Sequence, residues 1–170
     1  MQCKKALEEA AGDFKKAETM LAIRSKAVAL KKQSRETKVG IIGSYLHANE
    51  RVGVLIELFC ETDFVARNAK FKELAHDLAL QVAALKPAYV DPKNFPADFI
   101  AERTQAFLAE AAKERKPAAM QAKIAEGKLA KFLSDNSLLD QEFVKAPGKK
   151  VADVVGEYTA LLGEKIAVGR

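Results

Sequence analysis

The residues best suited to acid–base or metal chemistry are few in this 170-residue chain. His47 and His76 are its two histidines, and neither lies in a zinc-protease, nucleophile-elbow or phosphate-loop motif. Cys3 and Cys60 are its two cysteines, and they lack the close spacing that metal binding or redox chemistry requires. We therefore expect no catalytic site, no bound metal and no cofactor, and we interpret His76 as a structural residue on a helix.

A short polar turn with a phenylalanine in its middle is the most unusual feature of the sequence. It consists of Thr62, Asp63, Phe64 and Val65. Threonine and aspartate commonly accept hydrogen bonds from free backbone N–H groups where helices begin. From these residues alone, the favoured interpretation is that Asp63 caps a helix and Phe64 packs against that helix as a hydrophobic staple. The alternative is that Phe64 contacts a partner protein.

The elements on either side of the turn can be predicted from hydrophobic periodicity. Every second residue from 52 to 60 is apolar, which predicts a strand with one buried face. Apolar residues then recur at helical spacing, which predicts a helix over residues 68–85. Residues 61–66 must therefore carry the chain from a sheet into a helix.

This turn resembles the signature of elongation factor Ts, the family of nucleotide-exchange factors that act on the translational GTPase elongation factor Tu. Three further parts of the sequence match the same family in the same order. They are residues 1–10, residues 40–65, and residues 124–129 together with 138–145. The resemblance therefore extends over nearly the whole chain.

The resemblance implies a non-enzymatic role. In the family, the Asp-Phe pair enters the GTPase near its nucleotide, and the aromatic ring displaces side chains that support the bound Mg²⁺. Matched residue by residue, Phe64 is the wedge, Asp63 is its polar partner, and Thr62 and Val65 shape the turn. On this hypothesis Phe64 is exposed to solvent in the free protein.

Two short helices are predicted at the start of the chain, over residues 3–10 and 14–23. The resemblance implies that they belong to a three-helix module similar to a ubiquitin-associated domain, and we expect the sequence to begin inside its second helix. Met1 and Lys4 match a Met-x-Cys-Lys stretch whose helix touches the GTPase in the family. Both are therefore candidate partner contacts, with a chain-end residue and a solvated lysine as the alternatives.

The remaining pattern predicts an α+β core with a three-stranded antiparallel sheet packed with helices. The further predicted elements are strands over 39–47 and 166–168, helices over 97–114 and 118–135 that form an antiparallel hairpin, and an amphipathic helix over 151–162 that ends at Gly163. The predicted domains are a partial helical module over residues 1–25, a basic helical linker over 26–38, and a core and dimerisation domain over 39–170. The hairpin is expected to reach either a second domain of the GTPase or another subunit.

The charge of the chain is too small to identify a partner by itself. Lysine and arginine number 28 against 23 acidic residues, a net charge of +5 that is modest for a nucleic-acid-binding protein. The aromatic residues mostly lie at core spacing rather than in a stacking surface; they include Phe14, Tyr45, Phe71, Phe99, Phe107 and Tyr158. A basic RNA-binding or ribosome-associated helical module is thus the alternative function, and no direct contact with nucleic acid is expected.

The expected assembly is a homodimer, because short members of the family pair two chains to supply what longer members carry in one. An exposed sheet edge would be the natural interface. No apolar run approaches the ~20 residues that a membrane span needs, so no membrane contact is expected. The sequence favours the cytoplasm, with the matrix of an organelle as the alternative location.

Overall fold

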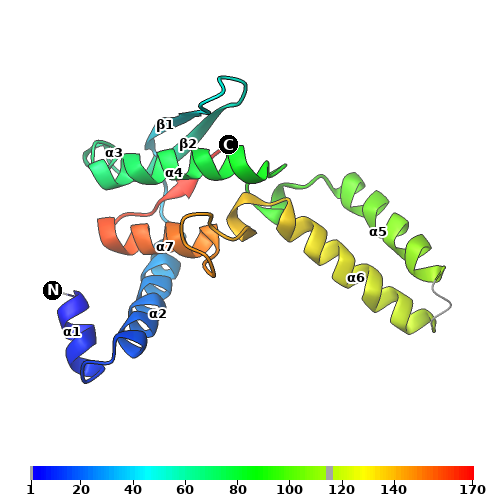
Figure 1. Cartoon of the computed structure of the whole chain (residues 1–170), viewed down its shortest axis with the longest axis horizontal. Helices are drawn as coiled ribbons and strands as arrows, with labels where there is room; N and C mark the ends of the chain where they lie inside the picture. Colours follow the sequence, from blue (N-terminus) through cyan, green and yellow to red (C-terminus); the bar gives the residue numbers. More distant parts are fainter. Residues whose placement is uncertain (1, 114–116) are drawn as a thin grey trace. The chain divides into compact units, whose positions relative to one another are not determined.

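Helices make up most of the chain, and three strands form one antiparallel sheet, as Figure 1 shows. The computed structural model describes residues 2–113 and 117–170. The elements in these residues are α1 (Gln2–Glu9), α2 (Phe14–Lys32), β1 (Val39–Leu46), β2 (Gly53–Cys60), α3 (Asp63–Ala66), α4 (Ala69–Leu85), α5 (Ala97–Ala112), α6 (Ala118–Asp135), α7 (Val151–Leu162) and β3 (Ala167–Val168), with short 3₁₀ helices at Pro92–Asn94 and Leu138–Asp140. The predicted α+β fold class is confirmed.

The chain divides into two compact units. The first contains residues 1–83 and 152–169, and the second contains residues 84–151 with Arg170. The first unit thus holds the sheet and most of the helices, whereas the second holds α5 and α6. The predicted boundaries near residues 25 and 38 rest on the basic composition of the segment between them, and they stay a prediction.

The sheet has the strand order β1-β2-β3, and both pairings are antiparallel. Strands β1 and β2 pair along their full length, from Val39 opposite Cys60 to Leu46 opposite Gly53. Strand β3 adds a short third strand, with Ala167 opposite Phe59. The three predicted strands are therefore present, and β2, which leads into the polar turn, lies in the centre.

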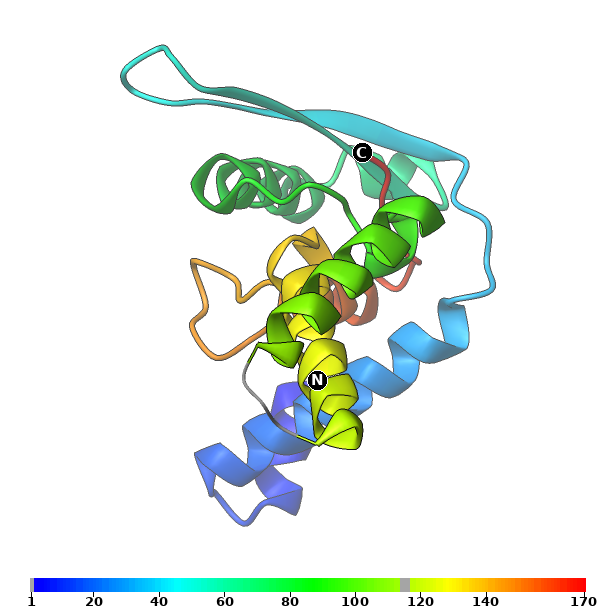
Figure 2. The same cartoon turned by 90° about the vertical axis from the view of Figure 1, so that its right-hand side faces the viewer.

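Helix α4 covers one face of this sheet (Figure 2). Gly43 of β1 allows the close approach, because a Cβ at that position would lie 2.8 Å from the Cβ of Ala75. Ile56 lies opposite Gly43 in the register, so it faces the helix as well. The buried core of this layer comprises Ile56, Leu58 and Cys60 of β2 and Phe71, Leu74, Ala75, Leu78 and Ala79 of α4. The predicted apolar face of β2 is confirmed.

The opposite side of the sheet, which we call the outer sheet face, carries Ile42, Leu46 and Leu55. These side chains are 68%, 67% and 73% exposed. The register places them together, because Ile42, Ser44 and Leu46 of β1 lie opposite Glu57, Leu55 and Gly53 of β2. Three large apolar side chains therefore face solvent on one surface.

Helices α1 and α2 pack against each other through small residues. Ala6, Ala10 and Ala17 are buried there, and Leu7, Met20 and Leu21 are partly buried against them. Helix α2 continues to Lys32, so it also includes the helical part of the predicted linker. Phe14 is 78% exposed, and its assignment to core spacing was wrong, because it begins α2 outside the contact made by Ala17 and Leu21.

The second unit contains the predicted antiparallel hairpin of α5 and α6, which run side by side in Figures 1 and 2. Helix α5 ends at Ala112 among the described residues, and the predicted end at residue 114 lies outside them. Aromatic rings pack together where α5 begins and α6 ends, and the ring centroids of Phe95 and Phe99 lie 5.7 Å apart. The guanidinium of Arg103 lies 5.0 Å from the ring of Phe132, at a distance typical of a cation–π interaction.

Candidate functional site

The polar turn lies where the central strand ends and the short helix α3 begins. Thr62 has an extended backbone, and its hydroxyl accepts a hydrogen bond from the N–H of Val65 at 3.5 Å. Thr62 is therefore the residue that caps α3. The thiol of Cys60 donates to the carbonyl oxygen of Thr62 at 3.1 Å, and burial raises the pKa of this thiol, which keeps it a neutral donor.

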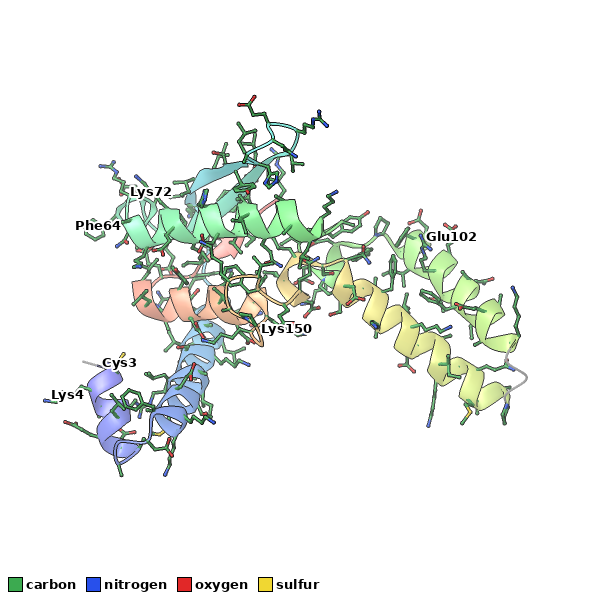
Figure 3. All side chains as sticks on the ribbon, viewed as in Figure 1. Cys3, Lys4, Phe64, Lys72, Glu102 and Lys150 are labelled. Carbon is green, nitrogen blue, oxygen red and sulfur yellow. The ribbon has the colours of Figure 1, made fainter. Side chains whose placement is uncertain are left out.

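Phe64 points away from the protein in Figure 3, and it is 82% exposed. Its neighbours Val65 and Ala66 are both buried. One helical turn is thus anchored through two small apolar residues while it presents a large aromatic ring to solvent. The predicted exposure of Phe64 is confirmed, and the interpretation of Phe64 as a staple on its own helix was wrong.

Asp63 lies in the first turn of α3, one residue after the cap. Its carboxylate accepts a hydrogen bond from the guanidinium of Arg67 at 2.8 Å, and both side chains are exposed. The interpretation of Asp63 as the helix cap was therefore wrong, because the preceding hydroxyl occupies that position. The Asp63 side chain is 67% exposed, so another molecule can reach its carboxylate.

Two glutamates that the sequence patterns did not indicate, Glu61 and Glu164, form hydrogen bonds that link this turn to the segment after α7. Glu164 accepts hydrogen bonds from the backbone N–H groups of Glu61 and Thr62, and Glu61 accepts one from the backbone N–H of Lys165. The guanidinium of Arg35 also donates to Glu61. Local sequence carries no signal for these contacts, because Glu164 and Thr62 lie 102 residues apart.

The structure does not bring Lys4 to the turn. Met1 lies outside the described residues. Lys4 is exposed on α1, where its ammonium lies 3.9 Å from the Glu8 carboxylate, and Figure 3 shows it on a different element from Phe64. Of the six predicted contact residues, Thr62, Asp63, Phe64 and Val65 lie together in the polar turn, and Lys4 lies on a different helix, α1.

The rings of His47 and His76 both lie near Tyr45, with centroids 6.1 Å and 5.8 Å from that of the tyrosine ring. Nδ1 of His47 lies 3.0 Å from the Tyr45 hydroxyl, and Nδ1 of His76 lies 3.3 Å from the carbonyl oxygen of Ser44. Within residues 2–113 and 117–170, no three histidine, cysteine or acidic side chains gather as metal ligands would. In the same residues no helix combines the length and apolar character that crossing a membrane requires.

Comparison with known proteins shows the family of this chain. The family model described as Elongation factor TS matches residues 8–170. Elongation factor Ts of Thermodesulfovibrio yellowstonii is 47% identical over 170 residues, which are all of this chain and 84% of that protein. The corresponding identities are 48% for Thermotoga maritima, with 84% of that protein covered, and 46% for Pseudothermotoga lettingae, with 86% covered. The chain therefore belongs to the elongation factor Ts family, the translation elongation factors that exchange nucleotide on elongation factor Tu.

Proposed function

We propose that this chain releases GDP from elongation factor Tu by inserting Phe64 beside the Mg²⁺ and nucleotide of that GTPase. The observation that carries the proposal is the 82% exposure of Phe64 on a turn whose other apolar residues are buried. An aromatic ring held in water gains free energy when a partner encloses it. Asp63 supplies a polar contact beside the ring, while Thr62 and Val65 set the conformation of the turn.

The energies suit this mechanism. Burial of one phenylalanine contributes about 1.5 to 3 kcal/mol, which is roughly a ten- to hundredfold change in an equilibrium constant. Mg²⁺ requires near-ideal octahedral geometry and bridges the phosphate oxygens of the nucleotide, so a small displacement of its surroundings weakens GDP binding. A single ring therefore supplies enough free energy to favour the loosened state of the GTPase.

Thermodynamic linkage then completes the cycle without a covalent step. If the exchange factor weakens GDP binding by some ratio, the bound nucleotide must weaken binding of the factor by the same ratio. Rebinding of GTP to the GTPase therefore expels the factor unchanged. This behaviour is that of an exchange factor, and it needs no acid, base or nucleophile.

The test is stopped-flow release of fluorescent GDP from elongation factor Tu, with the wild-type chain and with Phe64→Ala. We expect Phe64→Ala to slow the stimulated release by about ten- to hundredfold, which corresponds to the lost burial of one ring. Leu161→Ala is the matched control, because it removes another large apolar side chain, 65% exposed on α7. Equal release rates for wild type and Phe64→Ala would overturn the proposal.

We also propose that two copies of this chain pair through the sheet of the 39–170 core. The outer sheet face exposes Ile42, Leu46 and Leu55 to solvent. Strand β1, which carries two of these residues, is an edge strand of the sheet. Exposed apolar patches of this kind commonly mark protein interfaces. The family's exchange activity is then delivered by a homodimer, with Met1, Lys4 and the α5–α6 hairpin as further candidate contacts to the GTPase or to the other subunit.

A basic RNA-binding module is the competing proposal, and it makes a different prediction. Binding that depends on phosphate contacts weakens steeply as the salt concentration rises. Tight, salt-sensitive binding of this chain to RNA, without any effect on GDP release, would favour that alternative.

A further inference from the structure

We propose that Glu164 is a positioning residue that fixes the direction in which Phe64 points. The inference rests on the proposed function, in which Phe64 is the group inserted into the GTPase. It assigns a role in exchange to a side chain from the far end of the chain.

Three hydrogen-bond donors of the turn converge on the Glu164 carboxylate. Its Oε2 accepts from the backbone N–H of Thr62 at 2.9 Å and from the backbone N–H of Glu61 at 3.1 Å. Its Oε1 accepts from the hydroxyl of Thr62 at 2.7 Å. Hydrogen bonds to an ionised carboxylate are stronger than those between neutral groups, so both peptide planes before α3 are held firmly.

The bond to the Thr62 hydroxyl also sets the cap of α3. A hydroxyl can donate one hydrogen bond and accept two, and here the Thr62 hydroxyl donates its hydrogen bond to Glu164. A lone pair of the same oxygen is thereby left to accept from the N–H of Val65. Glu164 therefore orients the capping group, and the cap in turn orients the helical turn that carries Phe64.

A second glutamate, Glu61, makes the matching hydrogen bond in the opposite direction, from the turn to the segment that contains Glu164. Glu61 Oε1 accepts from the backbone N–H of Lys165 at 2.6 Å, so residues 61–62 and 164–165 each hold the backbone of the other. Arg35 donates to Glu61 at 3.1 Å, and the ammonium of Lys165 donates to the carbonyl oxygen of Arg35 at 2.7 Å. Both the backbone and the side chain of Lys165 are thus hydrogen-bonded, and these bonds hold the segment that carries Glu164 in place.

These hydrogen bonds are needed because α3 is too short to fix its own orientation. It contains four residues, far fewer than a helix needs to be stable by itself. Val65 and Ala66 anchor one side of it in the core, but Phe64 is almost fully exposed. The direction of the ring is therefore set by the backbone at residues 61–62, which is the segment that Glu164 binds.

The experiment compares Glu164→Ala and Glu164→Gln with the wild-type chain in stopped-flow release of fluorescent GDP from elongation factor Tu. At saturating concentrations of factor, we expect release to be about tenfold slower with Glu164→Ala, because a misplaced inserting group loses rate even when the complex forms. Glu164→Gln keeps one acceptor oxygen and is expected to lose about threefold, because it lacks the charge. Glu36→Gln is the matched control, since Glu36 is exposed and pairs with Lys38.

A fluorescence signal separates positioning from loss of fold. The chain contains no tryptophan, so Phe64→Trp introduces a single reporter at the turn. We expect Glu164→Ala in that background to lower the fluorescence anisotropy of Trp while the far-ultraviolet circular dichroism stays that of the folded protein. If Glu164→Ala fails to fold, the same comparison is made with Glu164→Gln.

The outcomes are distinct. Wild-type release and wild-type anisotropy in a folded Glu164 variant would overturn the positioning role. Slower release with lower anisotropy in a folded variant supports it. Unchanged release with Phe64→Ala would instead defeat the proposed function itself, whatever the Glu164 variants do.

Discussion

At the scale of single residues, the site depends on a contrast between neighbours. Phe64 is exposed, whereas Val65 and Ala66 are buried, and the Thr62 hydroxyl donates a hydrogen bond to Glu164. Val65 and Ala66 anchor the turn to the core, so the turn does not need Phe64 to pack inward. The ring is therefore available to a partner. The exposure of Phe64 is thus a consequence of how the turn is anchored.

Glu61 leads to a prediction about pH. The backbone N–H of Lys165, followed by the guanidinium of Arg35, lowers the pKa of Glu61 below its ordinary value of 4.5. Because the folded pKa is the lower one, the stabilisation by Glu61 is present above pH 4.5 and is lost as the pH falls toward the folded pKa. We expect the melting temperature of Glu61→Gln to lie below that of wild type at pH 7 and to approach it as the pH falls below 4.5 toward the folded pKa. A constant difference between these pH values would contradict the prediction.

At the scale of elements, the approach of α4 to β1 determines the layer that carries the turn. Gly43 makes this approach possible, since an added Cβ would lie 2.8 Å from Ala75 Cβ and 2.9 Å from the Ala75 carbonyl oxygen. The backbone of a helix cannot move aside as a flexible side chain can. The position of α4, and with it the end of the strand-to-helix connection, therefore depends on a residue without a side chain.

We expect Gly43→Ala to destabilise the protein by about 1 to 3 kcal/mol, the usual cost of an overpacked core. The measurement is the free energy of unfolding in urea. Gly53→Ala is the matched control, because Gly53 lies on the paired strand and an added Cβ there would meet its nearest atom at 3.8 Å, an ordinary contact. Equal stability of the two variants would show that α4 can shift without cost.

At the scale of the whole molecule, the question is what covers the outer sheet face. The inner face is packed by α4, so the sheet has a stable core on one side only. The apolar residues Ile42, Leu46 and Leu55 then remain in water in a single chain. A second copy of the chain would bury this surface, and the proposed homodimer follows from it.

We expect Leu55→Lys to shift the chain from dimer to monomer in sedimentation equilibrium, because a charged side chain is costly at the centre of an apolar interface. Leu55 is well exposed in the single chain, so the melting temperature measured at low protein concentration should change little. Leu161→Lys adds the same charge at an exposed position of α7, outside the sheet strands, and is expected to leave the assembly unchanged. A wild-type chain that is monomeric at all concentrations would refute the dimer.

Local pattern predicted most of the elements and the residues of the turn. Alternation over residues 52–60 predicted β2, and the helical spacing from Phe71 to Leu85 predicted α4 within one residue of its start. The end of α7 at Gly163 also followed from sequence, because this glycine adopts a positive φ of 75° that favours it over other residues. Each of these features depends on contacts among near neighbours in the chain.

The tertiary structure alone decided which way the turn faces. Whether Asp63 or Thr62 caps α3, and whether Phe64 packs inward or outward, depends on Glu164, whose partners Glu61 and Thr62 lie more than 100 residues away in the sequence. Phe14 shows the same limit, since its spacing suited a core that α1 does not extend to cover. Periodicity is a local property, so the sequence by itself determined the elements and the chemistry of the turn. Contacts between distant segments determined which side chains the folded protein leaves exposed.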